Sequence, residues 1–146
     1  MRAQPTSKAY LFAYFAALIT LMTADYFWLG TLMADFYKSH IGDVLLAQPR
    51  LVPALGFYLM YIAGLLFFAV SQGVAKHSLL SSIVRCALFG IVSYGTYDLS
   101  NWATLTMWTA DITAADMIWG ATVSAISGAV AHLILSRSTS FNHSLR

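Results

Sequence analysis

Long apolar runs separated by short polar stretches dominate the pattern of this chain. Four runs are long enough to cross the ~30 Å hydrocarbon core of a bilayer, which takes about 20 helical residues. Helices are required because a bilayer core offers no water to satisfy open backbone groups, and the alternation of a membrane β-strand is absent. The pattern therefore predicts an all-α chain with four transmembrane helices, at approximately residues 9–33, 51–70, 79–104 and 115–135.

The polar connections are short, which favours antiparallel packing of successive helices. We therefore predict a four-transmembrane-helix antiparallel bundle in which residues 1–146 form a single integral membrane domain. Pro53 lies near the beginning of the second run, where a missing backbone N–H costs nothing. Because no proline interrupts a run, we expect fairly straight helices.

The composition supports a bilayer as the solvent of this chain. Hydrophobic residues make up 59% and charged residues 10%, whereas an ordinary soluble domain is about one quarter charged. No basic tract is interleaved with aromatics, so we expect no nucleic-acid partner. Cys86 lies in an apolar run and is interpreted as a packing residue. No phosphate loop or zinc-protease motif occurs, and the sequence implies no cofactor and no metal.

Lysine and arginine are distributed unequally between the two predicted membrane faces. The positive-inside rule places the face richer in these residues in the cytoplasm. We therefore predict that both termini and the connection around Lys76 are cytoplasmic. One face carries Arg2, Lys8, Lys76, Arg85, Arg137 and Arg146, and the other carries Lys38 and Arg50.

Three aspartates lie in or against the apolar runs, where a charged side chain costs at least about 2.5–3.5 kcal/mol. Asp25 lies about eight residues before the outer end of the first run, and Asp98 about six before the outer end of the third. Asp116 lies near the outer beginning of the fourth. All three therefore belong to the outer half of the membrane. Such residues face the bundle interior or a wet cavity, so we expect them to converge.

Each aspartate has aromatic or polar companions at helical spacing. Asp25 and Trp28 share a helix face, and Asp116 and Trp119 repeat that spacing. We predict that these residues and others from all four helices line a ligand-binding pocket with an acidic floor and aromatic walls. The predicted pocket consists of Asp25, Trp28, Tyr58, Tyr61, Tyr94, Tyr97, Asp98, Asn101, Asp116 and Trp119.

Structural roles are the alternative for each of these residues. Tryptophan near a membrane end is commonly an interfacial anchor, which is our interpretation of Trp102 and Trp108 and stays open for Trp28 and Trp119. The aspartates could hold the bundle together by hydrogen bonds across helices. Asp116 precedes a predicted helix and could be its N-terminal cap.

A cluster of carboxylates leaves three chemical options. Close carboxylates repel each other, so a proton or a cation has to lie among them. A protonated aspartate can donate a hydrogen bond or act as a general acid, and an ionised one can hold an organic cation or a polar lipid head group. A hard divalent ion on Asp25, Asp98, Asn101 and Asp116 is the weakest option, because the spacing is not diagnostic.

Small residues on the fourth run indicate a close helix-packing surface. Gly120, Ser124 and Gly128 recur every four residues, which suits contact with another span or with a second copy in a homo-oligomer. His132 continues this stripe toward the cytoplasmic end, where we prefer a structural interpretation.

Several motifs in combination resemble a known family. They include Asp-Tyr-Phe-Trp-Leu-Gly at 25–30, Phe36-Tyr37, Thr-Tyr-Asp-Leu-Ser-Asn at 96–101 and Asp-x-x-Trp-Gly at 116–120. The chain resembles a bacterial family of small predicted inner-membrane proteins that carries only a domain-of-unknown-function label. The resemblance implies a multi-pass, four-helix protein of the bacterial inner (plasma) membrane. It supplies no activity and no catalytic residue.

Three functions follow from these observations. The first is a membrane protein that binds a lipid-like or amphipathic ligand in the outer pocket, or an accessory subunit. The second is a membrane enzyme that modifies a lipid-like substrate with Asp25 or Asp98 as acid/base. The third is a small proton-coupled transporter, for which the inner half offers only His132 and Arg85 as ionisable residues.

Overall fold

The computed structural model describes residues 5–144, with side chains to residue 138, and every element in that range is helical. The prediction of an all-α fold is confirmed. The elements are α1 (Ser7–Phe27), η1 (Trp28–Leu32), α2 (Ala34–Ile41), η2 (Gly42–Val44), α3 (Leu51–Gly64), η3 (Leu65–Val70), α4 (Ser71–Ala75), α5 (Leu79–Thr104) and α6 (Ala110–Ser144).

Four helical stretches are long and apolar enough to cross a membrane, which confirms the predicted four-helix bundle. They are Ser7–Leu32, Leu51–Ala75, Leu79–Thr104 and Ala110–Ser138. The fourth begins five residues before the predicted start at residue 115. The side chain of Thr109 accepts a hydrogen bond from the N–H of Ile112 (3.4 Å) and so caps the helix earlier than the apolar pattern indicates.

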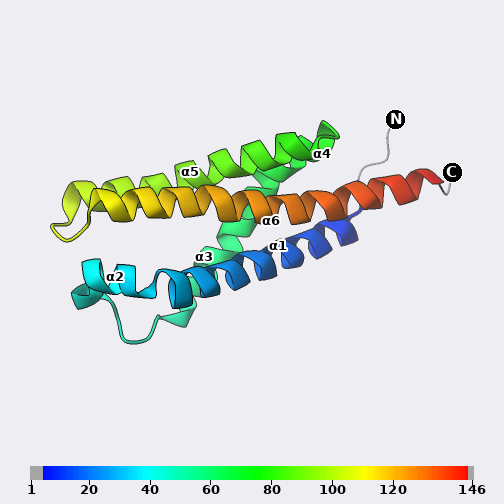
Figure 1. Cartoon of the computed structure of the whole chain (residues 1–146). Coiled ribbons are helices and arrows are strands. Elements are labelled where there is room, and N and C mark those ends of the chain that lie inside the picture. Colours follow the sequence, from blue (N-terminus) through cyan, green and yellow to red (C-terminus); the bar gives the residue numbers. More distant parts are fainter. Residues whose placement is uncertain (1–4, 145–146) are drawn as a thin grey trace.

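Helix α6 lies at the centre of the bundle (Figure 1). It runs beside α5 along most of its length and contacts α1 on its other side. Helix α3 crosses these helices obliquely and leads through η3 into α4, where the chain contacts both α5 and α6. Both described chain ends and the α4–α5 turn lie at one end of the bundle, here called the terminal end. Helix α2 and the α5–α6 turn lie at the opposite, distal end.

Small side chains at a spacing of four residues explain why α1, α5 and α6 approach closely. Removal of bulk from one helix face lets two backbones meet, which is how helices commonly associate in membranes. A Cβ added at Gly90 would collide with the carbonyl oxygen of Gly120, and one at Gly128 would collide with Cys86. The buried stripes comprise Ala9, Ala13, Ala17 and Leu21 on α1 and Ser82, Cys86 and Gly90 on α5.

The small-residue stripe of α6 is therefore used within the chain. Gly120, Ser124 and Gly128 are buried beneath α5 and its neighbours. The prediction that this face contacts a second copy in a homo-oligomer is wrong, because that contact would require the α5–α6 pair to open. The alternative, packing against another span, is confirmed. The buried His132 ring lies 2.7 Å from the Ser82 hydroxyl, which agrees with its structural interpretation.

Two of the spans contain π-helical segments, which the absence of proline in the apolar runs does not predict. η1 closes the first span, and η3 lies in the second half of the second span. Glycine accompanies both: Gly30 lies inside η1 and Gly64 directly precedes η3. A π-helical turn inserts one residue into the helical ladder and often marks a functional site. η1 begins at Trp28, one of the predicted site residues.

Candidate functional site

The three buried stripes extend into a cluster of carboxyl groups near the distal end. Asp25 continues the α1 stripe at the same four-residue spacing, and Asp98 continues that of α5 two turns after Gly90. With Asp116 on α6, each lies within two helical turns of the distal end of its span, about 10 Å deep at 1.5 Å per residue. The stripes that let the helices pack thus bring these carboxyl groups together.

Asp116 is an interior residue of α6. Because α6 begins at Ala110, the prediction that Asp116 could be an N-terminal cap is wrong, and Asp111 is the acidic residue of the first turn. Its interior position directs Asp116 toward Asp98 on the neighbouring helix, as the electrostatic contact between them shows.

Asp25 is buried and has a partner. One of its carboxyl oxygens accepts a hydrogen bond from the indole N–H of Trp119 (2.8 Å), which joins α1 to α6. The Tyr58 hydroxyl also faces this carboxyl group, so α3 reaches the same point. Asp25 is therefore held by groups from two other helices.

Two tryptophans form the centre of the cluster. The rings of Trp28 and Trp119 stack face to face, with centroids 4.4 Å apart and planes 2° from parallel. The Trp28 indole N–H donates to the Tyr37 hydroxyl (3.3 Å), which in turn donates to the Asp116 carboxyl group. This chain of contacts joins η1, α2 and α6.

Asp98 differs from the other two aspartates. Its side chain is 0% exposed, and neither carboxyl oxygen has a hydrogen-bond partner among the residues that the structure describes. The carboxyl group of Asp116 lies within hydrogen-bonding range, but two carboxylates are both acceptors, so that contact becomes a bond only when one carries a proton. The two carboxyl oxygens of Asp98 can therefore accept hydrogen bonds that none of the described side chains donates.

Helix α2 covers the cluster at the distal end. Tyr37 and Ile41, one turn apart, pack with Trp108 and Ile112 into a second small core. Burial and the adjacent Asp116 carboxyl group raise the pKa of the Tyr37 phenol above its ordinary value, which keeps the phenol protonated as a donor. The polar connection between the first two predicted spans thus contains an amphipathic helix tied to the site.

Not all predicted site residues join the cluster. Tyr61 bonds to Ser124 (2.6 Å) toward the bundle centre, and Tyr94 packs edge-on against the Tyr61 ring. Tyr97 is 60% exposed, because it lies one residue and so about 100° around the helix from Asp98. Asn101, half-buried, lies one turn beyond Asp98 at the end of α5.

Two residues at the site, Tyr37 and Trp108, are not among those that the sequence predicts. The interpretation of Trp108 as an interfacial anchor is wrong, because only 8% of it is exposed; Trp102, at 49%, fits that role. The apolar Tyr37–Ile41 spacing is a helical signal that could have identified α2. Nothing in the sequence shows that this short helix folds back over the spans.

No group of three or more His, Cys, Asp or Glu side chains in the described part of the chain is arranged to hold a metal ion. The chemical groups that the site offers are carboxyl oxygens as acceptors, indole N–H groups as donors and the stacked tryptophan rings.

A family model described as predicted membrane protein, DUF2177, matches residues 10–133, which include every residue of the cluster. No curated protein and no solved structure matches the chain. The chain belongs to this family of predicted membrane proteins.

Proposed function

We propose that this family member binds an amphipathic ligand through a primary ammonium head group, with Asp98 as the principal acceptor. The observation that carries the proposal is that both Asp98 carboxyl oxygens are fully buried and have no donor among the described residues. A buried polar group without a partner costs about 1–3 kcal/mol, more if charged. A ligand that supplies both a positive charge and N–H donors removes that cost.

The shape of the cluster favours a primary ammonium over a quaternary one. Quaternary ammonium groups are recognised mainly by the open faces of aromatic rings. Here the faces of Trp28 and Trp119 that meet are covered by each other. What the cluster offers is oxygen acceptors, which need N–H donors.

The setting favours an amphiphile over a water-soluble amine. Asp98 lies on a helix that qualifies as a membrane span, and neighbouring side chains such as Leu99 and Trp102 are exposed at the helix surface. An apolar tail in contact with these side chains would remain in the hydrocarbon region while the head reaches Asp98. By the positive-inside rule, the distal end faces away from the cytoplasm, as in a bacterial inner membrane with both termini cytoplasmic.

The test compares two lipids that differ in the substitution of the head-group nitrogen. The purified protein is mixed with equal amounts of phosphatidylethanolamine and phosphatidylcholine, and bound lipid is identified by native mass spectrometry. We expect a preference for phosphatidylethanolamine of about 10-fold or more, since a charge-assisted hydrogen bond contributes about 1.5–3 kcal/mol.

The matched control uses an aspartate of α6 that is exposed. Asp98→Asn should abolish the preference, and Asp111→Asn, outside the cluster, should retain it. Equal binding of the two lipids by the unaltered protein, or an undiminished preference in Asp98→Asn, would refute the proposed function.

A membrane enzyme is the second candidate, because the adjacent Asp98 and Asp116 carboxyl groups can hold one proton between them. Such a pair offers a general acid and a general base at one place. The purified protein would then change the mass of a component in a total lipid extract, and neither Asp98→Asn nor Asp116→Asn would do so. An extract left unchanged by the unaltered protein rules against catalysis and leaves the binding function in place.

A further inference from the structure

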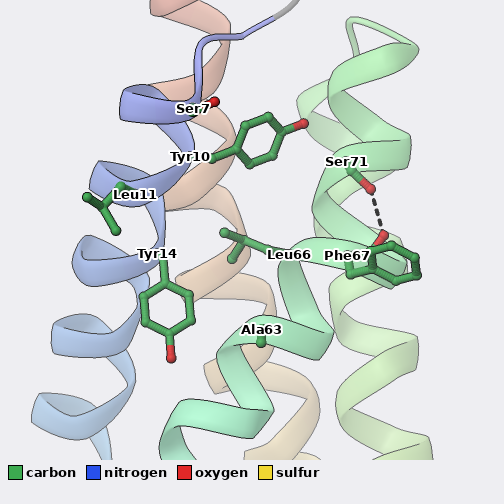
Figure 2. A pocket seen from close by; sticks show the side chains of 8 residues that line it. All are labelled: Ser7, Tyr10, Leu11, Tyr14, Ala63, Leu66, Phe67 and Ser71. Carbon is green, nitrogen blue, oxygen red and sulfur yellow. Dashed lines mark hydrogen bonds between the residues drawn. The ribbon is translucent and has the colours of Figure 1, made fainter.

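A groove opens in the terminal half of the molecule, at the opposite end from the carboxyl cluster. It lies between α1 on one side and α3, η3 and α4 on the other (Figure 2). Its volume of about 600 Å³ is within the range of small-molecule sites. The lining residues are Ser7, Tyr10, Leu11 and Tyr14 from α1 and Ala63, Leu66, Phe67 and Ser71 from the other wall.

The groove is apolar along most of its length and polar at its terminal end. Leu66, Phe67 and Ala63 form one wall, whereas Ser7, Ser71 and the hydroxyl of Tyr10 lie toward the end of the bundle in Figure 2. Ser71 donates to the carbonyl of Phe67 (2.6 Å), which leaves its oxygen able to accept. At the other end, Tyr14 donates to the carbonyl of Leu59 (2.9 Å) and ties α1 to α3.

The charge around the polar end is positive. Lys8 follows Ser7 directly, and Lys76 follows α4; both are exposed. All six acidic residues of the chain are aspartates at 25, 35, 43, 98, 111 and 116, away from this end. Basic side chains at a membrane surface attract anionic lipid head groups, at about 1 kcal/mol for each. The polar end of the groove therefore complements a phosphate.

We infer that this groove is a second lipid site, which takes one acyl chain of an anionic phospholipid whose phosphate lies at Lys8 and Ser71. Both walls belong to stretches that qualify as membrane spans, so the opening of the groove faces acyl chains. The site is independent of Asp98 and of any ligand bound there.

A second copy of the chain is the less favourable occupant. In a symmetric pair the same surface of both copies meets, and two copies in one membrane share their orientation. The basic ends of the two grooves would then lie side by side, with Lys8 and Lys76 of each copy near those of the other. The like charges of these lysines oppose a contact between two copies. A phosphate at the polar end of the groove is instead attracted by the same lysines.

The test fills the groove and measures retained lipid. Ala63, exposed in the groove wall, is replaced in Ala63→Trp, and Val84→Trp places the same ring on the exposed surface of α5 as a control. Delipidated protein is incubated with phosphatidylglycerol or phosphatidylcholine and analysed by native mass spectrometry. We expect one phosphatidylglycerol per chain, reduced at least tenfold by Ala63→Trp and unchanged by Val84→Trp.

Two further variants separate the parts of the inference. Lys8→Gln should weaken the binding of phosphatidylglycerol without affecting the binding of phosphatidylcholine. Asp98→Asn should leave the binding of both lipids unchanged. A failure of this inference can therefore be distinguished from a failure of the proposed function. Equal retention by Ala63→Trp and the unaltered protein would overturn the site. A chain dimer that Ala63→Trp dissociates would overturn the assignment of a lipid.

Discussion

Asp25, Asp98 and Asp116 carry the same chemical group at the same depth, yet their surroundings differ. Asp25 accepts from Trp119, and Asp116 accepts from Tyr37. Asp98 has no donor among the described residues. Because a buried acceptor without a donor is costly, this difference is the reason that we propose Asp98 as the acceptor for a ligand.

The cost borne by Asp98 leads to a prediction about stability. Asp98→Asn replaces an unpartnered carboxyl group by a neutral amide whose N–H can donate to Asp116. The free energy of unfolding in mild detergent should rise by about 1–3 kcal/mol, measured by thermal unfolding. Asp111→Asn, at an exposed position, should change it by less than about 0.5 kcal/mol. A destabilised Asp98→Asn would mean that this carboxyl group supports the fold.

The Tyr37 hydroxyl leads to a prediction about pH. The pKa of this phenol is raised in the folded state, so the folded chain retains the proton to higher pH than the unfolded chain. The contribution of the Tyr37 phenol to the free energy of unfolding is therefore fully present below the ordinary tyrosine pKa of about 10. It is lost as the pH rises above that value. Tyr37→Phe should lower stability by about 1–3 kcal/mol at neutral pH.

The unfolding of the two proteins should then be compared between pH 8 and pH 11. The difference in the free energy of unfolding between the unaltered protein and Tyr37→Phe should be constant to about pH 10. At higher pH this difference should shrink. An advantage that grows with pH would contradict the donation from Tyr37 to Asp116.

At the scale of elements, close packing of α5 on α6 fixes the depth of the site. Gly90 is a point of close approach between backbones, because a Cβ there would meet the carbonyl oxygen of Gly120. A backbone atom cannot move aside as a side chain can, so the two helices would have to separate. Asp98 and Asp116 lie just beyond this point and depend on it for their contact.

Glycine substitutions test that dependence. Gly90→Ala should destabilise the protein by about 1–3 kcal/mol or more, the usual cost of overpacking. Gly30→Ala is the matched control, because a Cβ at Gly30 has no atom within 4 Å. Thermal unfolding measures both. Equal effects of the two substitutions would show that α5 and α6 do not meet at Gly90.

Hydrophobic runs were sufficient to find the four spans, because each run exceeds the length that a bilayer requires. The runs did not reveal α2, because its eight residues lie in a polar connection and only the Tyr37–Ile41 spacing indicates a helix there. They also could not reveal η1 and η3, since a π-helical turn changes the register without changing composition.

For the site, helical spacing placed the three aspartates at one level. The outward position of Tyr97 and the covering role of Tyr37 depend on how helices rotate and pack, which spacing alone does not fix.

At the scale of the whole molecule, charge is divided between the two ends. The terminal end carries Lys8, Lys76, Arg85 and Arg137, and every aspartate lies toward the distal end. Arg2 and Arg146, which also support the predicted orientation, lie outside the described residues. The two proposed lipid sites follow this division, because the acidic cluster suits an ammonium and the basic groove suits a phosphate.

Cysteine labelling in intact cells tests the orientation. Ser39→Cys places a thiol on exposed α2, and His77→Cys places one in the exposed α4–α5 turn. Native Cys86 is buried and should stay unmodified. A membrane-impermeant maleimide should label Ser39→Cys in intact cells and His77→Cys only after the membrane is opened. The reverse pattern would invert the orientation and place the carboxyl cluster in the cytoplasmic leaflet.

Infrared difference spectroscopy with dodecylamine as the probe tests most directly whether Asp98 receives an ammonium. Addition of dodecylamine to the protein in lipid nanodiscs should change the carboxyl absorption, and Asp111→Asn should give the same difference spectrum. Asp98→Asn should lack that change. A difference spectrum in Asp98→Asn identical to that of the unaltered protein would contradict the account.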